Sequence, residues 1–133
     1  MNARTAYLDT SAFLKLVVTE PESAALRRSL LRWSERTSAA LLRTEAVRAL
    51  RRAGHDHRVG SARRLLRAMR LIRLDERLLD QAGDLDPREL RSLDSVHLAA
   101  ALAVGGDLAV FVTYDERLGG AARDRGLVVD SPR

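Results

Sequence analysis

The chain of 133 residues contains no cysteine, a single lysine and few aromatic residues. Without cysteine it forms no disulfide and binds no metal through thiolates, which agrees with a reducing compartment. With so few aromatic side chains, we expect no platform on which nucleic-acid bases stack. No apolar run reaches the roughly 18 residues of a membrane-spanning helix, and the first residues lack the apolar core of a signal peptide. We therefore expect a cytoplasmic protein with no membrane partner.

Length and charge set the next limits. A chain of 133 residues is long enough for one domain with one core, so we predict a single domain over residues 1–133. The formal net charge is +5 and the isoelectric point is near 10.8. This balance favours an anionic partner such as nucleic acid. A genome of high GC content would produce the same richness in alanine, leucine and arginine, so charge alone leaves both explanations open.

Short apolar runs alternate with helical segments along the whole chain. This alternation is typical of a parallel sheet covered by helices on both faces. We therefore predict the α/β class, a three-layer α/β/α sandwich with a central, mostly parallel sheet of about five strands. The expected strands are residues 5–8, 37–40, 71–74, 108–113 and 127–129. The expected helices are residues 11–16, 22–33, 42–53, 59–69, 75–82, 92–104 and 116–125.

Turn residues support these boundaries. Gly54, the Gly105-Gly106 pair and Gly126 each follow an expected helix, where a left-handed residue often ends the helix. Ser92 is placed to N-cap the helix that begins beside it.

Four carboxylates lie inside or directly beside apolar stretches: Asp9, Glu45, Asp94 and Asp115. Carboxylates rarely stay buried unless an arginine, a shared proton or a metal ion neutralises them. Ligands of open α/β sheets bind beyond the carboxyl ends of the strands. Asp9 and Asp115 each follow an expected strand, and the other two lie near the starts of expected helices. We therefore predict that the four acids share one site, provided the strands before Asp9 and Asp115 are neighbours.

Each acid also has an ordinary structural explanation. Asp9 and Asp115 suit the N-cap positions of the helices that follow them. Asp94 lies in a first helical turn, where the helix dipole favours an anion. Glu45 has Arg48 one turn later and could form a helical ion pair with it. These explanations account for the acids singly, whereas their common placement at strand ends and helix starts favours a shared acidic site.

The composition of such a site predicts its chemistry. Clustered carboxylates repel one another unless a proton or a cation is present. Oxygen ligands without cysteine or paired histidine favour Mg²⁺ or Mn²⁺ over Zn²⁺. Ions of this kind polarise phosphoryl oxygens and activate water, so the natural reaction is hydrolysis of a phosphodiester.

Four motifs that contain these acids follow one another along the chain. They are Leu8-Asp9-Thr10-Ser11-Ala12-Phe13 with Lys15; Thr44-Glu45 with Arg48-Ala49-Leu50; Leu93-Asp94-Ser95-Val96-His97-Leu98-Ala99-Ala100-Ala101; and Val112-Thr113-Tyr114-Asp115-Glu116-Arg117-Leu118. In this order they resemble the PIN-domain family, and in particular the VapC-type toxins of bacterial toxin–antitoxin modules. The resemblance spans nearly the whole chain, and four motifs in order are more specific than any one of them.

The resemblance implies an activity, a cofactor and partners. Asp9, Glu45, Asp94 and Asp115 would be the catalytic and metal-binding acids, with Mg²⁺ as the cofactor and Mn²⁺ as a substitute. The implied function is an endoribonuclease toxin of a type II toxin–antitoxin system that hydrolyses phosphodiester bonds of tRNA or rRNA. The implied partners are the RNA substrate, a VapB-type antitoxin that blocks the acidic pocket, and a second copy in a homodimer.

Neighbouring polar residues leave two explanations open. His97 lies one turn after Asp94 and suits either packing in the core or an auxiliary role in the site. The hydroxyls of Thr10, Ser11 and Thr113 suit either capping and packing or the orientation of a metal-bound water. Arginines also form a basic helix face that is either solvated or a track for RNA; they are Arg63, Arg64, Arg67 and Arg70.

Two other functions compete with cleavage. A non-catalytic PIN-like module would bind RNA or an antitoxin without cutting. A phosphoacceptor receiver domain shares the class of sheet, but it requires a lysine late in the chain, and Lys15 is the only lysine.

Overall fold

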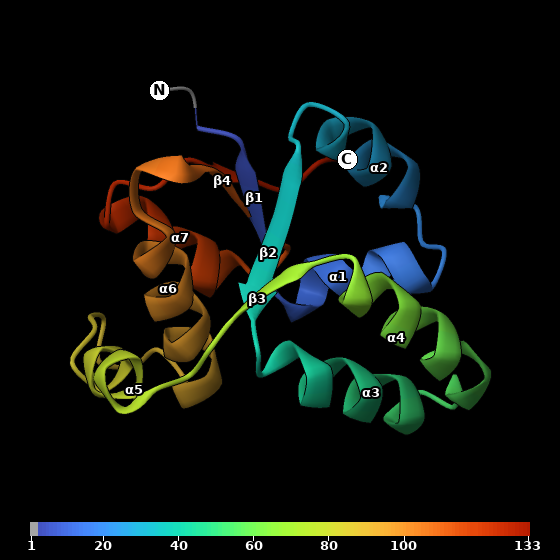
Figure 1. Ribbon diagram of the computed structural model, residues 1–133, viewed down its shortest axis with the longest axis horizontal. Coiled ribbons are helices and arrows are strands. Elements are labelled where there is room, and N and C mark those ends of the chain that lie inside the picture. The colour runs from blue at the N-terminus through green and yellow to red at the C-terminus, as the bar shows by residue number, and fades with distance from the viewer. Residues whose placement is uncertain (1–2) are drawn as a thin grey trace.

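The computed structural model describes residues 3–133 and contains one sheet of five parallel strands (Figure 1). The order of the strands across the sheet is β3-β2-β1-β4-β5, and each neighbouring pair is parallel. β1 is therefore central, with β4 directly beside it, which is the arrangement that a shared site for Asp9 and Asp115 requires. The strands are β1 (Thr5–Leu8), β2 (Glu35–Ala39), β3 (Arg70–Ile72), β4 (Leu108–Val112) and β5 (Val129–Asp130).

Helices cover both faces of the sheet and complete the three-layer α/β/α sandwich (Figure 1). On one side, α5, α6 and α7 pack over the sheet, and on the other side α1 and α2 do so, with α3 and α4 packed beyond α1. Their bounds are α1 (Thr10–Val17), α2 (Ser23–Leu30), α3 (Leu42–Arg52), α4 (Val59–Arg67), α5 (Glu76–Gly83), α6 (Ser92–Val104) and α7 (Glu116–Asp124). Short 3₁₀ turns, Asp56–Arg58 and Gly105–Asp107, precede α4 and β4.

The core lies between the central strands and α6. Tyr7 of β1 and Phe111 of β4 are fully buried and stack with their ring planes 5° apart and their centroids 5.2 Å apart. Above them α6 presents Leu98 and a run of buried alanines, so the helix approaches the sheet closely. Side chains of this kind, removed from water, supply the main force that holds the layers together.

The structure confirms the order of the elements and corrects several of their ends. Ser92 is not the N-cap of α6: the helix already includes it, and Arg91, with extended backbone, holds the cap position. Because α4 ends at Arg67, Arg70 belongs to β3 and does not continue the helical arginine face. Gly54, Gly105 and Gly126 have φ angles of 77°, 71° and 83°, as expected for glycines that end helices. Within residues 3–133, no helix has both the length and the apolarity needed to cross a membrane.

Candidate active site

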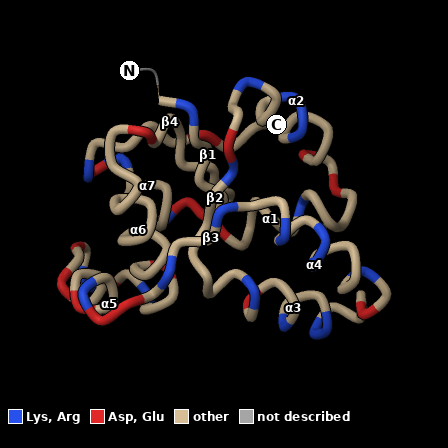
Figure 2. The backbone as a smooth tube through the Cα atoms, in the orientation of Figure 1, with Lys and Arg blue, Asp and Glu red and all other residues tan. Residues whose placement is uncertain are grey.

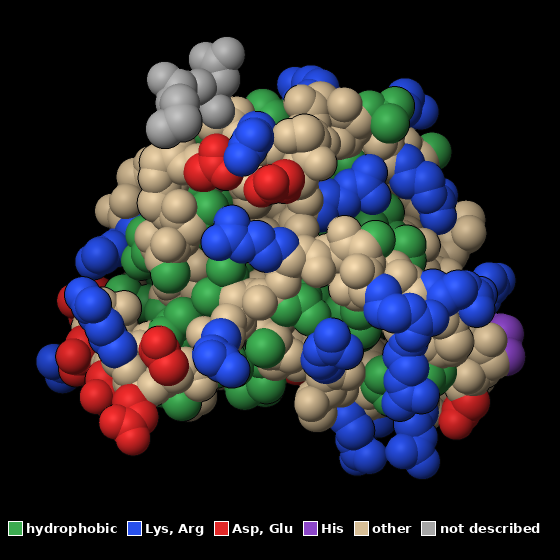
Figure 3. All heavy atoms as spheres, in the orientation of Figure 1, with side chains coloured by type: hydrophobic (Ala, Val, Ile, Leu, Met, Phe, Trp, Pro, Cys, Tyr) green, Lys and Arg blue, Asp and Glu red, His purple; other side chains and the backbone are tan. Residues whose placement is uncertain are grey.

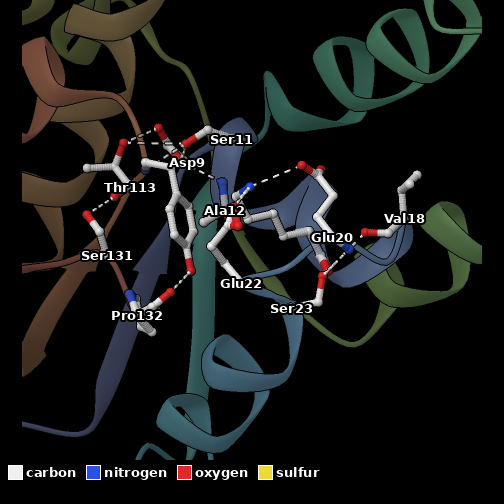
Figure 4. Close-up of polar contacts among 12 residues, drawn as sticks. Asp9, Ser11, Ala12, Val18, Glu20, Glu22, Ser23, Thr113, Ser131 and Pro132 are labelled. Carbon is white, nitrogen blue, oxygen red and sulfur yellow. Dashed lines mark hydrogen bonds and ion pairs between the residues drawn. The ribbon is translucent and has the colours of Figure 1, made fainter.

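Asp9 lies at the carboxyl edge of the sheet, directly after β1, and is 3% exposed. It is the N-cap of α1, and its Oδ1 accepts hydrogen bonds from the Ala12 N–H at 2.9 Å and the Ser11 hydroxyl at 2.7 Å. Its Oδ2 accepts a third bond, at 2.6 Å, from the hydroxyl of Thr113, which directly follows β4 (Figure 4). Pairing of β1 with β4 therefore brings residues more than a hundred positions apart onto one carboxylate.

Thr113 joins Asp9 to Asp115. Besides donating to Asp9, its buried hydroxyl accepts a bond of 3.0 Å from the backbone N–H of Asp115. Asp115 is in turn the N-cap of α7, where its Oδ1 accepts from the Leu118 N–H at 2.9 Å. One threonine hydroxyl thus fixes the backbone that carries the second acid relative to the carboxylate of the first.

Glu45 enters the site through His97. In the first turn of α3, its Oε1 lies 2.7 Å from Nε2 of His97 and accepts a bond of 2.6 Å from the Thr10 hydroxyl. The other ring nitrogen of His97 lies 2.7 Å from the hydroxyl of Tyr7. Glu45 is therefore bound to a histidine of α6 and not to Arg48, so the expected alternative of a helical ion pair is wrong.

Asp94 lies in the first turn of α6, one turn before His97, and it is half-buried. Burial raises its pKa, and the nearby carboxylates of Asp115 and Asp9 raise it further, while Arg91 and His97 act in the opposite direction. The charges of Asp115 and Asp9 thus act on Asp94, which places it in the same electrostatic surroundings.

All four acids occupy the positive ends of helices. Asp9 and Asp115 are the N-caps of α1 and α7, and Glu45 and Asp94 lie in the first turns of α3 and α6. The partial positive charge of each helix start stabilises an anion there. The capping explanations and the shared-site explanation are therefore compatible, because the caps are what hold two of the carboxylates at the edge of the sheet.

Burial and hydrogen bonding act differently on the two most constrained carboxylates. Burial raises the pKa of Asp9, and the bonds from Thr113, Ser11 and Ala12 offset this only in part. Burial also acts to raise the pKa of Glu45, but the hydrogen bonds from His97 and Thr10 outweigh it, so the pKa of Glu45 is lowered. Glu45 is thus held as an anion more firmly than Asp9.

The C-terminal segment forms hydrogen bonds with the residues that follow β4, next to Asp115. The hydroxyl of Ser131 donates to the carbonyl oxygen of Thr113, and the hydroxyl of Tyr114 donates to the carbonyl oxygen of Pro132 at 2.7 Å (Figure 4). Lys15 lies 4.7 Å from the centre of the Tyr114 ring and pairs with Glu22 at 2.7 Å and Glu20 at 3.2 Å. The single lysine of the chain is therefore held by two carboxylates and an aromatic ring.

The site differs from the expectation in two respects. Asp9 is buried, but Glu45, Asp94 and Asp115 are only half-buried. Across residues 3–133, no three histidine, aspartate or glutamate side chains are placed to hold one metal ion together. The acids are linked through Thr113, His97 and Thr10 and through their charges. The pairing of Glu45 with His97 was missed, since nothing in the sequence relates residues of α3 and α6.

Comparison with known proteins identifies the family. Residues 6–124 match the family described as PIN domain. Ribonuclease VapC46 of Mycobacterium tuberculosis is 49% identical over 126 residues, which cover 95% of this chain and 96% of the relative. Ribonucleases VapC47 and VapC35 of the same species are 39% and 37% identical over 130 and 133 residues, again covering 95% of this chain and 96% of each relative.

Solved structures agree in fold. The M. tuberculosis protein VapC20, a sarcin–ricin loop cleaving toxin, superposes with a TM-score of 0.75 at 18% identity, over 96% of this chain and 99% of its own. VapBC2 from Rickettsia felis, bound to a DNA fragment from their promoter, gives a TM-score of 0.73 at 13% identity, over 97% and 99%. The resemblance to VapC-type proteins and the three-layer fold are thus confirmed, and the chain belongs to the PIN-domain family.

Proposed function

We propose that this chain is a VapC-type toxin, a metal-dependent endoribonuclease that hydrolyses RNA phosphodiester bonds and belongs to a type II toxin–antitoxin module. The names of its relatives, ribonucleases VapC46, VapC47 and VapC35, support the reaction. The observation that carries the proposal is the network at the carboxyl edge of the sheet, where Thr113 bridges Asp9 to Asp115 and His97 holds Glu45 beside Thr10. A site of ionised oxygens at this edge suits an electropositive ligand and the phosphate bound to it.

The donor set fits a hard divalent ion, Mg²⁺ or Mn²⁺. A carboxylate offers about four lone-pair sites, and three hydrogen bonds to Asp9 leave one of them on Oδ2. The raised pKa of Asp94, caused by burial and then by Asp115 and Asp9, is the sign of unrelieved repulsion that a cation would remove. Asp9, Asp94 and Asp115 are not already arranged around one point in the structure, and in this proposal their side chains would close around the ion on binding, with Glu45 completing the acidic set. When bound, such an ion polarises a phosphoryl oxygen and lowers the pKa of water.

The chain's own residues provide orientation. Thr113 and Ser11 keep the Asp9 carboxylate in one rotamer, and the Ala12 N–H fixes the same group from α1. Glu45 remains ionised at neutral pH, since the bonds from His97 and Thr10 outweigh its burial, so it can accept a proton or a metal ion. Because these groups are already held in place, they need little rearrangement when the substrate binds.

The same proposal extends to the RNA substrate, the inhibitor and the oligomeric form. The substrate would be tRNA or rRNA, the inhibitor a VapB-type antitoxin that covers the acids, and the active form a homodimer. VapBC2 of Rickettsia felis, whose fold this chain shares, is a complex of the kind proposed here.

The test is cleavage of total cellular RNA by the purified chain with Mg²⁺ and with EDTA. Wild type should cut only with metal, and Asp9→Asn and Asp94→Asn should abolish cutting while circular dichroism shows an intact fold. Asp80→Asn, which removes an exposed acid on α5, serves as the matched control and should cut normally. Full activity of either site variant, or undiminished activity in EDTA, contradicts the proposal.

A non-catalytic module is the alternative. The lack of three acidic or histidine side chains already arranged around one ion, among residues 3–133, is the observation in its favour. Such a module would bind RNA or an antitoxin at stoichiometric ratios and release no fragments. Multiple turnovers of a defined RNA by a small amount of protein exclude it.

A further inference from the structure

Charge is distributed very unevenly along this chain. Residues 42–73 contain ten arginines and only two acids, a formal charge of +8. The remaining residues carry thirteen basic and sixteen acidic side chains, a formal charge of −3. The positive charge of the whole protein therefore comes from one segment, which comprises α3, α4, the turns around them and the edge strand β3 (Figure 2).

The arginines of this segment face solvent, and few are neutralised. All ten are exposed. Of the two acids, Glu45 binds His97, and Asp56 lies 3.8 Å from Arg51 in an exposed pair of little strength. We call the exposed arginines on α3 and α4 the arginine face; in the space-filling view, basic side chains gather over these two helices (Figure 3).

The arginine face begins at the acidic site and leads away from it. Glu45 lies in the first turn of α3, against His97, whereas Arg48, Arg51 and Arg52 follow on the next turns of the same helix. α4 packs beside α3 and adds Arg63, Arg64 and Arg67, of which only Arg64 has a side-chain partner among the described residues, the hydroxyl of Ser61. An α3 of 11 residues is about 16 Å long, which is enough to run beside several phosphates of one strand.

The opposite flank of the site has the opposite charge. Residues 75–94, which include α5 and the start of α6, contain seven acids against three arginines. α5 packs against α6 on the side away from α3; Figure 2 shows acidic positions along this part of the backbone, and acidic side chains gather there in Figure 3. A polyanion that reaches the site is therefore attracted on the α3 side and repelled on the α5 side.

We propose that the arginine face is the surface along which the RNA strand leaves the active site, and that it binds the phosphates of that strand. The inference rests on the proposed ribonuclease function and adds the direction and the mode of RNA binding. Guanidinium groups grip phosphate through two parallel hydrogen bonds, which lysine cannot do. The direct continuation of the face from Glu45 favours the substrate of this site over an acidic protein as its occupant.

The face recognises the backbone of RNA and not its bases. Residues 42–73 contain no phenylalanine, tyrosine or tryptophan, so no aromatic ring is available there for stacking. Contacts to phosphate position a nucleic acid without reading its sequence. The face should thus strengthen the binding of cognate and unrelated RNA equally, and the choice of the cleaved bond must come from residues elsewhere.

The test measures RNA binding without cleavage, in an Asp94→Asn background. Fluorescence anisotropy with two single-stranded RNA oligonucleotides, of equal length and unrelated sequence, gives Kd over a range of salt concentrations. Arg63→Gln with Arg67→Gln should raise Kd for both RNAs by the same factor and should reduce the slope of log K against log salt by about 1.4, since each lost phosphate contact contributes about 0.7 on single strands. In the active protein the same pair should raise KM and leave kcat unchanged.

The matched control is Arg77→Gln with Arg88→Gln, which removes equal charge from exposed positions on the acidic flank. The control should change the salt slope by far less. Equal effects of the two pairs would show that only net charge matters and would overturn the inference, as would an unchanged slope in the Arg63 and Arg67 variant. Weaker antitoxin binding or a lost dimer at unchanged RNA affinity would assign the face to a protein and also overturn it.

The outcome separates the two proposals. If wild type cleaves RNA in Mg²⁺ but the Arg63 and Arg67 variant binds RNA normally, the ribonuclease function stands and the arginine face is rejected. If the variant loses salt-dependent binding but no protein form cleaves RNA, the face stands and the catalytic proposal fails.

Discussion

Nε2 of His97 lies 2.7 Å from Oε1 of Glu45, so a residue of α6 fixes a carboxylate of α3 across 52 positions of the chain. A carboxylate only accepts hydrogen bonds, so Nε2 carries the hydrogen toward Glu45, while Nδ1 lies 2.7 Å from the Tyr7 hydroxyl. Three elements, β1, α6 and α3, thus meet in one chain of hydrogen bonds that orients the acid.

His97→Ala should reduce RNA cleavage by about 10–100-fold, the usual cost of removing a group that orients a metal-binding or catalytic ligand. The reason is that Glu45 keeps Thr10 as a donor but loses His97, without which the remaining hydrogen bond no longer offsets its burial to the same extent. Initial rates at saturating Mg²⁺ measure the loss. Tyr7→Phe, which keeps the ring and removes only the bond to Nδ1, should have a smaller effect; an equal loss in both variants would show disruption of the core instead.

Asp94→Asn should stabilise the metal-free protein at neutral pH. The folded-state pKa of Asp94 is raised above its usual 3.8, by burial and then by Asp115 and Asp9, so its contribution to stability is fully present below the unfolded pKa and is lost as pH rises through the folded pKa. Urea unfolding in EDTA from about pH 3, below the usual pKa of an aspartate, to about pH 7 measures the difference between variant and wild type. The asparagine variant should gain relative stability as pH rises; a constant difference contradicts the assignment.

Mg²⁺ should raise the melting temperature at pH 7. A ligand that binds only the folded state stabilises it by about 2.7 kcal/mol at a concentration about 100 times its Kd. Differential scanning fluorimetry with and without EDTA gives the shift. Asp94→Asn should show a smaller shift than the exposed control Asp80→Asn, and equal shifts in the two variants would argue against a metal site at Asp94.

Leu98→Ala should cost about 2–5 kcal/mol of unfolding free energy, as is usual for leucine-to-alanine changes in a packed core. Leu98 is fully buried where α6 meets the sheet. Leu31 provides the matched control because the same residue type is there 81% exposed at the end of α2. Leu31→Ala should change stability by no more than about 0.5 kcal/mol, and comparable losses at both positions in chemical denaturation would mean that the core is placed wrongly.

The sequence predicted the layers because alternation of helices and strands is a local pattern. It also placed Asp9 and Asp115 at one edge of the sheet, since Asp9 directly follows one expected strand and Asp115 comes one residue after another, and the pairing of β1 with β4 confirmed the condition. Cap positions were less predictable: α6 spans residues 92–104 as expected, but Arg91, with extended backbone, holds the N-cap position that the chemistry of Ser92 suggested for Ser92.

The hydrogen bonds that connect the acids could not be predicted from the sequence. The bond from Thr113 to Asp9 and the pairing of His97 with Glu45 depend on how distant elements pack, and hydroxyls and histidines occur in many core and cap positions for other reasons. The half-buried state of Asp94 likewise depends on which face the start of α6 turns outward, and a helix that is apolar nearly all round does not show this in its pattern.

The unequal charge of the two flanks makes the molecule an electric dipole, with its positive pole over α3 and α4 and its negative pole over α5. In the field of a polyanion such a molecule rotates before contact, so encounters occur preferentially with α3 and α4 leading. Orientation of this kind shortens the search for a productive complex and fades as dissolved ions screen the field. The rate of association should thus depend on salt more steeply than the modest net charge alone would suggest.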